Sequence, residues 1–173
     1  MNTLIRNAVV WLAGAALMIG ASVASAAQSQ TTINATATIN SNCLVSASNL
    51  AFGTYDPTAA DRDVNTTVLV RCTTGTGYTV TLSAGVTSGA TFAQRRMVFG
   101  GTNFMDYNLY RDAARTEILG DGSVGTFTVT GTGTGIGIAQ QQTVTVYGRI
   151  PTGQDTLPIG TYTESTITVT VIY

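Results

Sequence analysis

Apolar and polar side chains alternate with a period of two along most of the chain beyond residue 60. The clearest run places Val64, Val68 and Val70 on one face and Thr67 and Arg71 on the other. Such alternation is typical of a β-strand that buries one face. The same pattern marks five further segments: 78–82, 97–99, 126–130, 144–150 and 167–173.

Turn residues separate these segments at short intervals, as at Gly75 and Gly77 and again at Pro151 and Gly153. The faces opposite the apolar ones carry mostly hydroxyl groups, as expected when two sheets share a core and keep their outer faces wet. We therefore predict an all-β protein with an immunoglobulin-like sandwich. Residues 112–119 could form one helical turn, and the glycine-rich stretch 131–137 is expected to be a mobile hairpin or loop.

The N-terminus has the pattern of a signal peptide. Arg6 precedes an uncharged apolar run over residues 8–20, and Ala24 and Ala26 supply the small residues of a cleavage site. The run is shorter than the roughly 20 residues that a membrane-spanning helix needs. We expect cleavage after Ala26, which leaves a single exported domain.

Charge is sparse, and its composition excludes several chemistries. The chain has 8 Arg and 9 acidic residues, but neither Lys nor His. A Schiff-base lysine, a histidine general base and a histidine-ligated zinc are therefore excluded. The low cation content also argues against nucleic acid as a partner. We predict no enzyme activity, no metal and no cofactor.

Two cysteines remain after the expected cleavage, Cys43 and Cys72. Export brings a protein into an oxidising compartment, and the spacing of this pair is not that of a redox CxxC motif. We predict that they form a structural disulfide.

Acidic residues cluster in the segment 106–122, where Asp112 with Glu117, or Asp121, could in principle act as two carboxylates on a sugar bond. The alternative, which we favour, is a solvated loop in which Arg111, Asp112 and Arg115 form surface ion pairs. Asp61 and Asp63 lie in a similar turn that lacks the oxygen-rich loop of a calcium site.

Residues 27–40 form an uncharged segment in which small apolar side chains alternate with polar ones. Ile33, Ala35, Ala37 and Ile39 share one face, and threonines and asparagines occupy the other. Such a segment can add a strand to another chain. The alternation continues through Cys43 and Val45, so the pattern equally permits a long first strand of the same sandwich.

Four stretches in order complete the sequence picture: the start around Cys43, and the segments 107–122, 145–154 and 158–173. Together they resemble the spore coat protein U domain, a family that includes the archaic, Csu-type chaperone-usher pilus subunits. The resemblance covers nearly the whole mature chain. It implies a signal peptide over 1–26, a donor-strand extension over 27–40 and a pilin-like sandwich over 41–173.

The resemblance implies assembly without chemistry. Subunits of this kind lack the last strand of the sandwich. A periplasmic chaperone lends a strand to the open groove until, at an outer-membrane usher, the extension of the next subunit replaces it. By resemblance, Ile33, Ala35, Ala37 and Ile39 are the inserted side chains. Part of the groove wall is then Ile167, Val169 and Val171, and the carboxylate of Tyr173 anchors the chaperone.

The implied function is a secreted structural subunit of a surface pilus that supports adhesion and biofilm formation. The implied partners are the chaperone, the usher and further copies of itself or related subunits. One alternative is a self-complemented spore-coat or extracellular matrix protein, in which the extension fills its own groove. Another is a binding module for sugars or surfaces.

Overall fold

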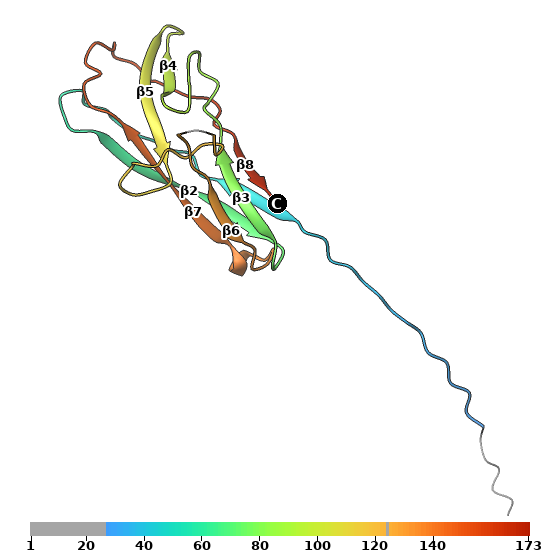
Figure 1. Cartoon of the computed structure of the whole chain (residues 1–173). Coiled ribbons are helices and arrows are strands. Elements are labelled where there is room, and N and C mark those ends of the chain that lie inside the picture. Colours follow the sequence, from blue (N-terminus) through green and yellow to red (C-terminus); the bar gives the residue numbers. More distant parts are fainter. Residues whose placement is uncertain (1–26, 124) are drawn as a thin grey trace, which may run out of the picture. The chain divides into compact units, whose positions relative to one another are not determined.

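The computed structural model describes residues 27–123 and 125–173 (Figure 1). The chain divides into two units after Ala37, somewhat before the expected boundary at Asn40. The predicted signal peptide, residues 1–26, lies outside the described residues. In the described part, no helix combines the length and the hydropathy that a membrane span requires.

Two antiparallel sheets form the body of the protein (Figure 1). The larger has five strands in the order β1 (Cys43–Ala47), β2 (Arg62–Cys72), β7 (Gln142–Ile150), β5 (Asn103–Tyr110) and β4 (Arg95–Phe99). The smaller has three, in the order β6 (Val129–Thr132), β3 (Gly77–Leu82) and β8 (Val169–Ile172). A single turn of 3-10 helix, η1 (Ile138–Gln140), is the only helix in the described residues. The predicted all-β sandwich is confirmed.

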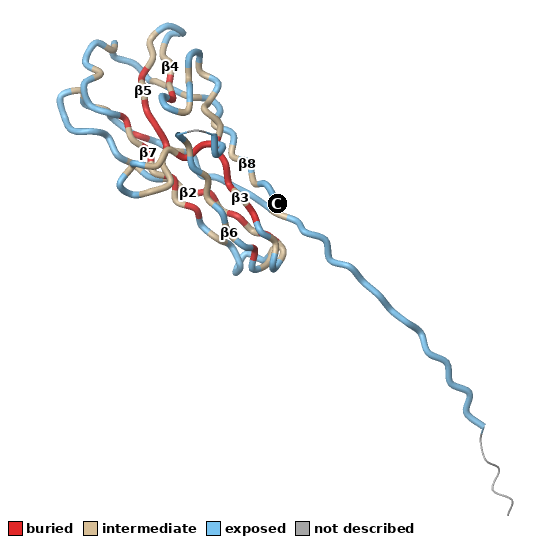
Figure 2. Tube along the Cα trace, viewed as in Figure 1, coloured by how far each residue is buried: buried red, intermediate tan, exposed pale blue. Residues whose placement is uncertain are grey.

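The predicted inward faces are confirmed for the long strand β2. Val68, Val70 and Cys72 are buried, whereas Thr67 and Arg71 on the opposite face are only half-buried. Buried residues (red in Figure 2) run along the facing strands of both sheets. The core lies between the sheets and consists of Phe52, Val68, Val70, Cys72, Tyr78, Val80, Leu82, Met97, Met105, Tyr107, Leu109, Leu119, Val144, Val146 and Ile150.

The helical turn that residues 112–119 could have formed is not present in the structure. The Asp112 carboxylate accepts hydrogen bonds from the backbone N–H groups of Thr116 and Glu117, at 3.1 and 2.8 Å, and these bonds compete with helical ones. Arg115 adopts a positive φ of 58°, which no right-handed helix contains. The segment is therefore a compact turn.

The glycine-rich stretch 131–137 begins within β6 and continues as a loop. Backbone N–H groups of Gly133 and Gly135 donate to the carbonyls of Thr76 and Cys72, at 2.7 and 2.9 Å. These bonds tie the stretch to the turn that joins β2 and β3.

The predicted disulfide between Cys43 and Cys72 is present and joins β1 to β2 at a pair of directly opposed residues. Because β1 hydrogen-bonds to a strand on one side only in the described structure, this covalent link holds an edge strand in register.

Replacing both cysteines by serine should lower the free energy of unfolding by about 3 to 4 kcal/mol, since the loop of 29 residues then regains its freedom in the unfolded chain. Urea denaturation of the purified monomer measures this loss. Reduction of the wild-type disulfide should cost the same amount, and an unchanged midpoint in both experiments would contradict the prediction.

Candidate functional site: an open groove between two sheet edges

β1 and β8 are edge strands of different sheets. In the described structure β1 pairs only with β2, and β8 only with β3. Each edge therefore leaves a row of backbone N–H and C=O groups that a further strand could pair with. The two strands approach each other, and both lie at the same border of the sandwich (Figure 1). An additional strand would complete the sandwich at this border.

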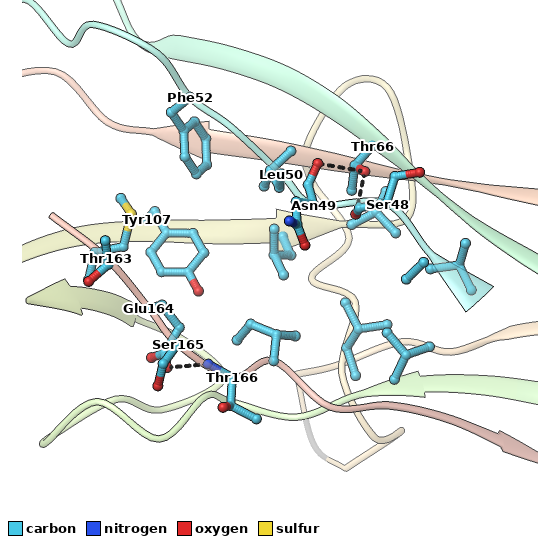
Figure 3. Close-up of a pocket in the computed structure, with 18 of the residues that line it drawn as sticks. Ser48, Asn49, Leu50, Phe52, Thr66, Tyr107, Thr163, Glu164, Ser165 and Thr166 are labelled. Atoms are coloured by element: carbon cyan, nitrogen blue, oxygen red, sulfur yellow. Dashed lines mark hydrogen bonds between the residues drawn. The ribbon is translucent and has the colours of Figure 1, made fainter. Parts of the chain in front are cut away.

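A groove of about 420 Å³ opens into the core beside these edges (Figure 3). One wall is the segment 47–52, which follows β1, and the other is the segment 162–169, which leads into β8. The floor is made by core side chains of both sheets: Val68, Leu82, Met97, Tyr107, Leu109 and Val146. The groove is thus a gap in the hydrophobic core.

The segment after β1 crosses the larger sheet because β7 has a glycine at the crossing point. A Cβ atom at Gly148 would lie 2.7 Å from the Leu50 side chain and 3.0 Å from the Phe52 ring. The side chains of Leu50 and Phe52 therefore occupy the space above Gly148. Hydrogen bonds from the Thr66 hydroxyl to the carbonyls of Ser48 and Asn49, at 2.8 and 3.3 Å, hold the same segment (Figure 3).

In the last segment, the residues predicted to form the groove wall alternate with exposed threonines, as the sequence suggested. Ile167, Val169 and Val171 are half-buried against the core, whereas Thr168 and Thr170 are exposed. Ile167 and Val169 line the groove itself. Tyr173 lies beyond the end of β8 and is exposed.

The predicted donor residues lie in a segment without regular structure. Residues 27–42 form no strand and are exposed throughout, with 91% of Ile33 and 87% of Ile39 accessible. The first strand begins only at Cys43, so the alternative of one continuous edge strand from Ile33 to Val45 is not what the structure contains.

The carboxylate of Glu164 anchors one wall of the groove. It accepts hydrogen bonds from the backbone N–H groups of Thr87 and Thr166, both at 3.1 Å, and of Val86 at 3.4 Å. Burial tends to raise the pKa of Glu164, but these hydrogen bonds outweigh it and hold the pKa below its usual value. The ionised form therefore ties segment 162–169 to the loop after β3.

Stability should be independent of pH between about pH 5 and 9, because the chain has no histidine or lysine and no free thiol. Below about pH 4 it should fall. The pKa values of Glu164 and of Asp63, which is hydrogen-bonded to Arg149, are lower in the folded protein than in the unfolded chain, so their stabilisation is lost on protonation. Urea denaturation midpoints measured across this pH range test the prediction. The substitution Glu164→Gln should reduce the loss of stability at low pH. A stability maximum near pH 7 would contradict it.

The acidic residues considered for catalysis are engaged in local structure. Glu117 forms an ion pair with Arg111 at 2.7 Å. Asp112 bonds to the backbone as described, so the predicted ion pairing of Asp112 is wrong. Asp121 accepts hydrogen bonds from the backbone N–H of Ser123 and the hydroxyl of Thr126, at 2.9 and 3.3 Å. These contacts serve the folding of the loop 112–126.

Asp61 and Asp63 likewise face arginines. Arg149 contacts Asp63 at 2.7 Å and Asp61 at 3.3 Å, and Arg115 contacts Asp63 at 3.2 Å. The side chain of Arg115 is only 11% exposed, which makes it less of a surface residue than predicted. Within the described residues, no group of three or more acidic or cysteine side chains is arranged to hold a metal ion.

Sequence reasoning missed two residues at the groove. Tyr107 on the floor is 5% exposed, and its hydroxyl points toward the segment that carries Glu164 and Thr166 (Figure 3). Burial, and secondarily the charge of Glu164, raise the pKa of Tyr107, so the phenol stays protonated. The alternation of segment 103–110 could have revealed this inward position.

Arg95 is the second missed residue. It is fully buried in the core, beside Tyr107, its partner in the neighbouring strand. Its guanidinium donates to the carbonyls of Ser83 and Leu119, at 2.8 and 2.7 Å, and to the Asn108 side chain at 2.6 Å. Burial lowers the pKa of Arg95 to about 10, so it remains charged at neutral pH. An inward-facing arginine runs against the alternation rule and left no signal in the sequence.

Comparisons with known proteins bear on the family and the fold. A search of curated proteins returned no match. Among solved structures, the protein is similar to a chain of the CsuC–CsuE chaperone–tip adhesion subunit pre-assembly complex from archaic chaperone-usher Csu pili of Acinetobacter baumannii. The TM-score is 0.55 at 25% identity, and the match covers 79% of this chain but only 40% of that one. The model of the Spore Coat Protein U domain matches residues 29–170. The protein therefore belongs to the spore coat protein U domain family.

Proposed function

We propose that this protein is a structural subunit of a chaperone-usher surface pilus and polymerises by donor-strand exchange. The observation that carries the proposal is that one chain has both an open groove between the edges of β1 and β8 and an exposed segment with alternating apolar side chains. The similarity to a chain of a Csu chaperone–subunit complex supports the same assignment.

The donor segment is long enough to run along most of the groove. From Ile33 to Ile39 an extended strand covers about 20 Å at about 3.3 Å per residue. The wall from Tyr162 to Val169 spans at most about one residue more. At about 0.8 kcal/mol per buried CH₂, the side chains of Ile33, Ala35, Ala37 and Ile39 contribute several kcal/mol. Backbone pairing with the edge of β8 adds to this stabilisation.

The direction of insertion follows from the ends of the strands. β1 begins at Cys43, opposite Cys72, and β8 ends where it pairs with the beginning of β3. Because a short turn joins Cys72 to β3, the start of β1 and the end of β8 lie at the same end of the sandwich. When the incoming strand runs antiparallel to β8, the subunit that donates it lies at the opposite end of the sandwich. It therefore does not collide with the end at which β1 begins and β8 ends. Such head-to-tail contacts do not close, so they generate a filament.

An unfilled groove lined by valine and isoleucine is an aggregation hazard. A periplasmic chaperone that lends a strand protects it before the usher in the outer membrane exchanges that strand for the next subunit. The assembled filament lies at the cell surface, where it supports adhesion and biofilm formation.

The proposal is tested by mixing the mature chain with a variant that lacks residues 27–40. The variant keeps a groove but has no strand to donate, so it can accept a neighbour and cannot extend beyond itself. Increasing amounts should shorten the multimers of the wild-type chain, as measured by gel electrophoresis of unheated samples.

The competing model, a self-complemented coat or matrix protein, gives a different outcome. The mature chain would then remain a soluble monomer, and the amides of residues 33–39 would exchange slowly with deuterium. That result would overturn donor-strand exchange between subunits.

A further inference from the structure

We propose that the end of the sandwich from which the donor segment leaves packs against the accepting subunit, beside the groove that takes up the segment. The first surface consists of residues 40–42, 73–76 and 133–141, and we call it the linker end. The second consists of residues 157–161, and we call it the groove rim. This contact presupposes the proposed function, because it forms between two subunits that donor-strand exchange has joined. It assigns the glycine-rich stretch 131–137 to an interface between copies of this chain.

A short linker holds the two surfaces near each other. Only two residues separate Ile39, the last donor side chain, from Asn42. Asn42 is fixed to the linker end, because its carbonyl accepts a hydrogen bond from the backbone N–H of Thr73 at 2.9 Å and its own N–H donates to the Thr73 hydroxyl at 2.8 Å. An extended chain spans at most about 3.6 Å per residue, so Ile39 and Asn42 lie no more than about 11 Å apart. Once Ile39 is inserted, the linker end must therefore lie against the accepting subunit.

The groove rim lies where the linker leaves the accepting subunit. Because the proposed incoming strand runs antiparallel to β8, Ile39 lies at the end of the groove that is marked by Tyr162. Residues 157–161 continue the same wall directly beyond that point. Within one subunit the rim lies beside the outer ends of β4 and β5, at the opposite end of the sandwich from the linker end (Figure 1). The contact is therefore between two different ends and repeats along a filament.

The groove rim is a fixed edge that displays one apolar side chain. Ile159 is fully exposed. The backbone beside it is closely packed, since a Cβ atom at Gly160 would lie 2.6 Å from the ring of Phe99. The hydroxyl of Tyr162 donates to the carbonyl of Pro158 at 2.9 Å and ties the rim to the groove wall. The rim therefore offers apolar surface that another subunit can cover.

The linker end carries apolar and hydroxyl side chains. A cavity of about 360 Å³ lies beside the linker and is lined by Ile136 and by threonines of the turn 73–76. Ile138 follows in η1 and is 80% exposed. None of the residues that form this end is charged. Charged residues are depleted at the centres of protein interfaces, so this composition is the one expected of a surface that a neighbour covers.

The glycines of the stretch 131–137 allow this surface to form. A Cβ atom at Gly133 would lie 2.5 Å from the carbonyl oxygen of Thr73 and 2.6 Å from that of Cys72. Gly135 has a φ of 141°, a conformation that favours glycine. The backbone of the stretch can therefore lie directly on the turn between β2 and β3, which leaves Ile138 at the surface of the linker end.

The test joins the two surfaces chemically in multimers of the mature chain. Ile138→Cys together with Ile159→Cys places one thiol on each surface, and the two natural cysteines do not interfere because they are paired in a disulfide. A short bismaleimide reagent should then link neighbouring subunits. Heating in detergent separates subunits that only a donor strand joins, so a ladder of multimers that survives heating measures the cross-link.

The matched control is Ala114→Cys together with Ile159→Cys, which moves the first thiol away from the linker end. Ala114 is exposed and precedes Arg115, which donates to Asn65. Along β2, Asn65 lies seven residues from Cys72, or about 23 Å. Thiols held within reach of each other have effective concentrations in the millimolar range. At micromolar protein, the pair at 138 and 159 should therefore cross-link roughly a hundredfold faster than the control pair.

Charge substitutions test whether the contact stabilises the multimer. Ile138→Asp and Ile159→Asp should each speed the dissociation of multimers about tenfold, because each places a carboxylate in the apolar contact. Ala114→Asp should dissociate like the wild type. All three side chains are exposed in the monomer, so its urea denaturation midpoint should stay unchanged.

The possible failures can be told apart. If multimers form but the pair at 138 and 159 reacts no faster than the control pair, the proposed contact is wrong while donor-strand exchange stands. Wild-type dissociation rates in both aspartate variants would contradict the contact in the same way. If the wild-type chain itself forms no multimers, the proposed function fails, and the contact fails with it.

Discussion

Replacing Ile33 by aspartate is expected to abolish multimer formation by the mature chain. In the proposed filament this side chain enters the groove of the neighbouring subunit, where it faces the core side chains of the floor and Val169 of the wall. An ionised carboxylate placed there without a partner costs far more than the several kcal/mol that the donor side chains contribute. Size-exclusion chromatography should find only monomer, or monomer bound to its chaperone.

Asn34→Asp is the matched control, since it introduces the same charge at the adjacent position on the opposite face of the segment. That side chain remains in solvent after insertion, so assembly should continue at close to the wild-type rate. Equal effects of the two substitutions would show that charge alone, and not insertion of the Ile33 face, limits assembly. The assigned parity of the donor strand would then be wrong.

Arg95→Met is expected to lower the free energy of unfolding by about 3 to 5 kcal/mol. The substitution removes the guanidinium that bonds to the half-buried carbonyl of Ser83 and the buried carbonyl of Leu119. Methionine fills much of the volume but donates no hydrogen bond, so both carbonyls lose this partner. Because Ser83 follows β3 in the smaller sheet and Arg95 begins β4 in the larger one, the loss also weakens the link between the sheets.

Arg96→Met provides the comparison at the neighbouring position. Arg96 points outward, is 29% exposed and forms an ion pair with Asp106 at 3.1 Å. An exposed pair of this kind contributes about 0 to 1 kcal/mol. Urea denaturation of the two variants should therefore separate them clearly, and similar midpoints would contradict the structural role of Arg95.

The fold was largely predictable from the sequence because most strands bury one face. In β2, β3 and β7 the alternation of valine with threonine predicted both that the segment is a strand and which of its faces is buried. The alternation of Ile167, Val169 and Val171 likewise predicted which side of the last segment faces the core. The disulfide was predictable because the chain has two cysteines, which allow one pairing, and because the expected export favours oxidation.

Three local features were not predictable, because they depend on contacts that the alternation of side chains does not show. Leu50 and Phe52 lie in a segment without alternation, and their position depends on the missing side chain of Gly148. Arg95 occupies an inward position that the alternation rule reserves for apolar residues, and only the carbonyls around it make that position tolerable. The turn at Asp112 was missed because a side chain replaced the helical hydrogen bonds.

The exposed segment 27–42 contains no arginine, lysine, phenylalanine, tyrosine, tryptophan or leucine. Trypsin and chymotrypsin choose their cleavage sites by a basic or a large apolar side chain, respectively, that enters a specificity pocket. Trypsin therefore finds no target in this stretch, and chymotrypsin finds none of its preferred aromatic residues. If the segment is the proposed donor strand, it can in this way stay exposed before assembly and still resist proteases of these two specificities.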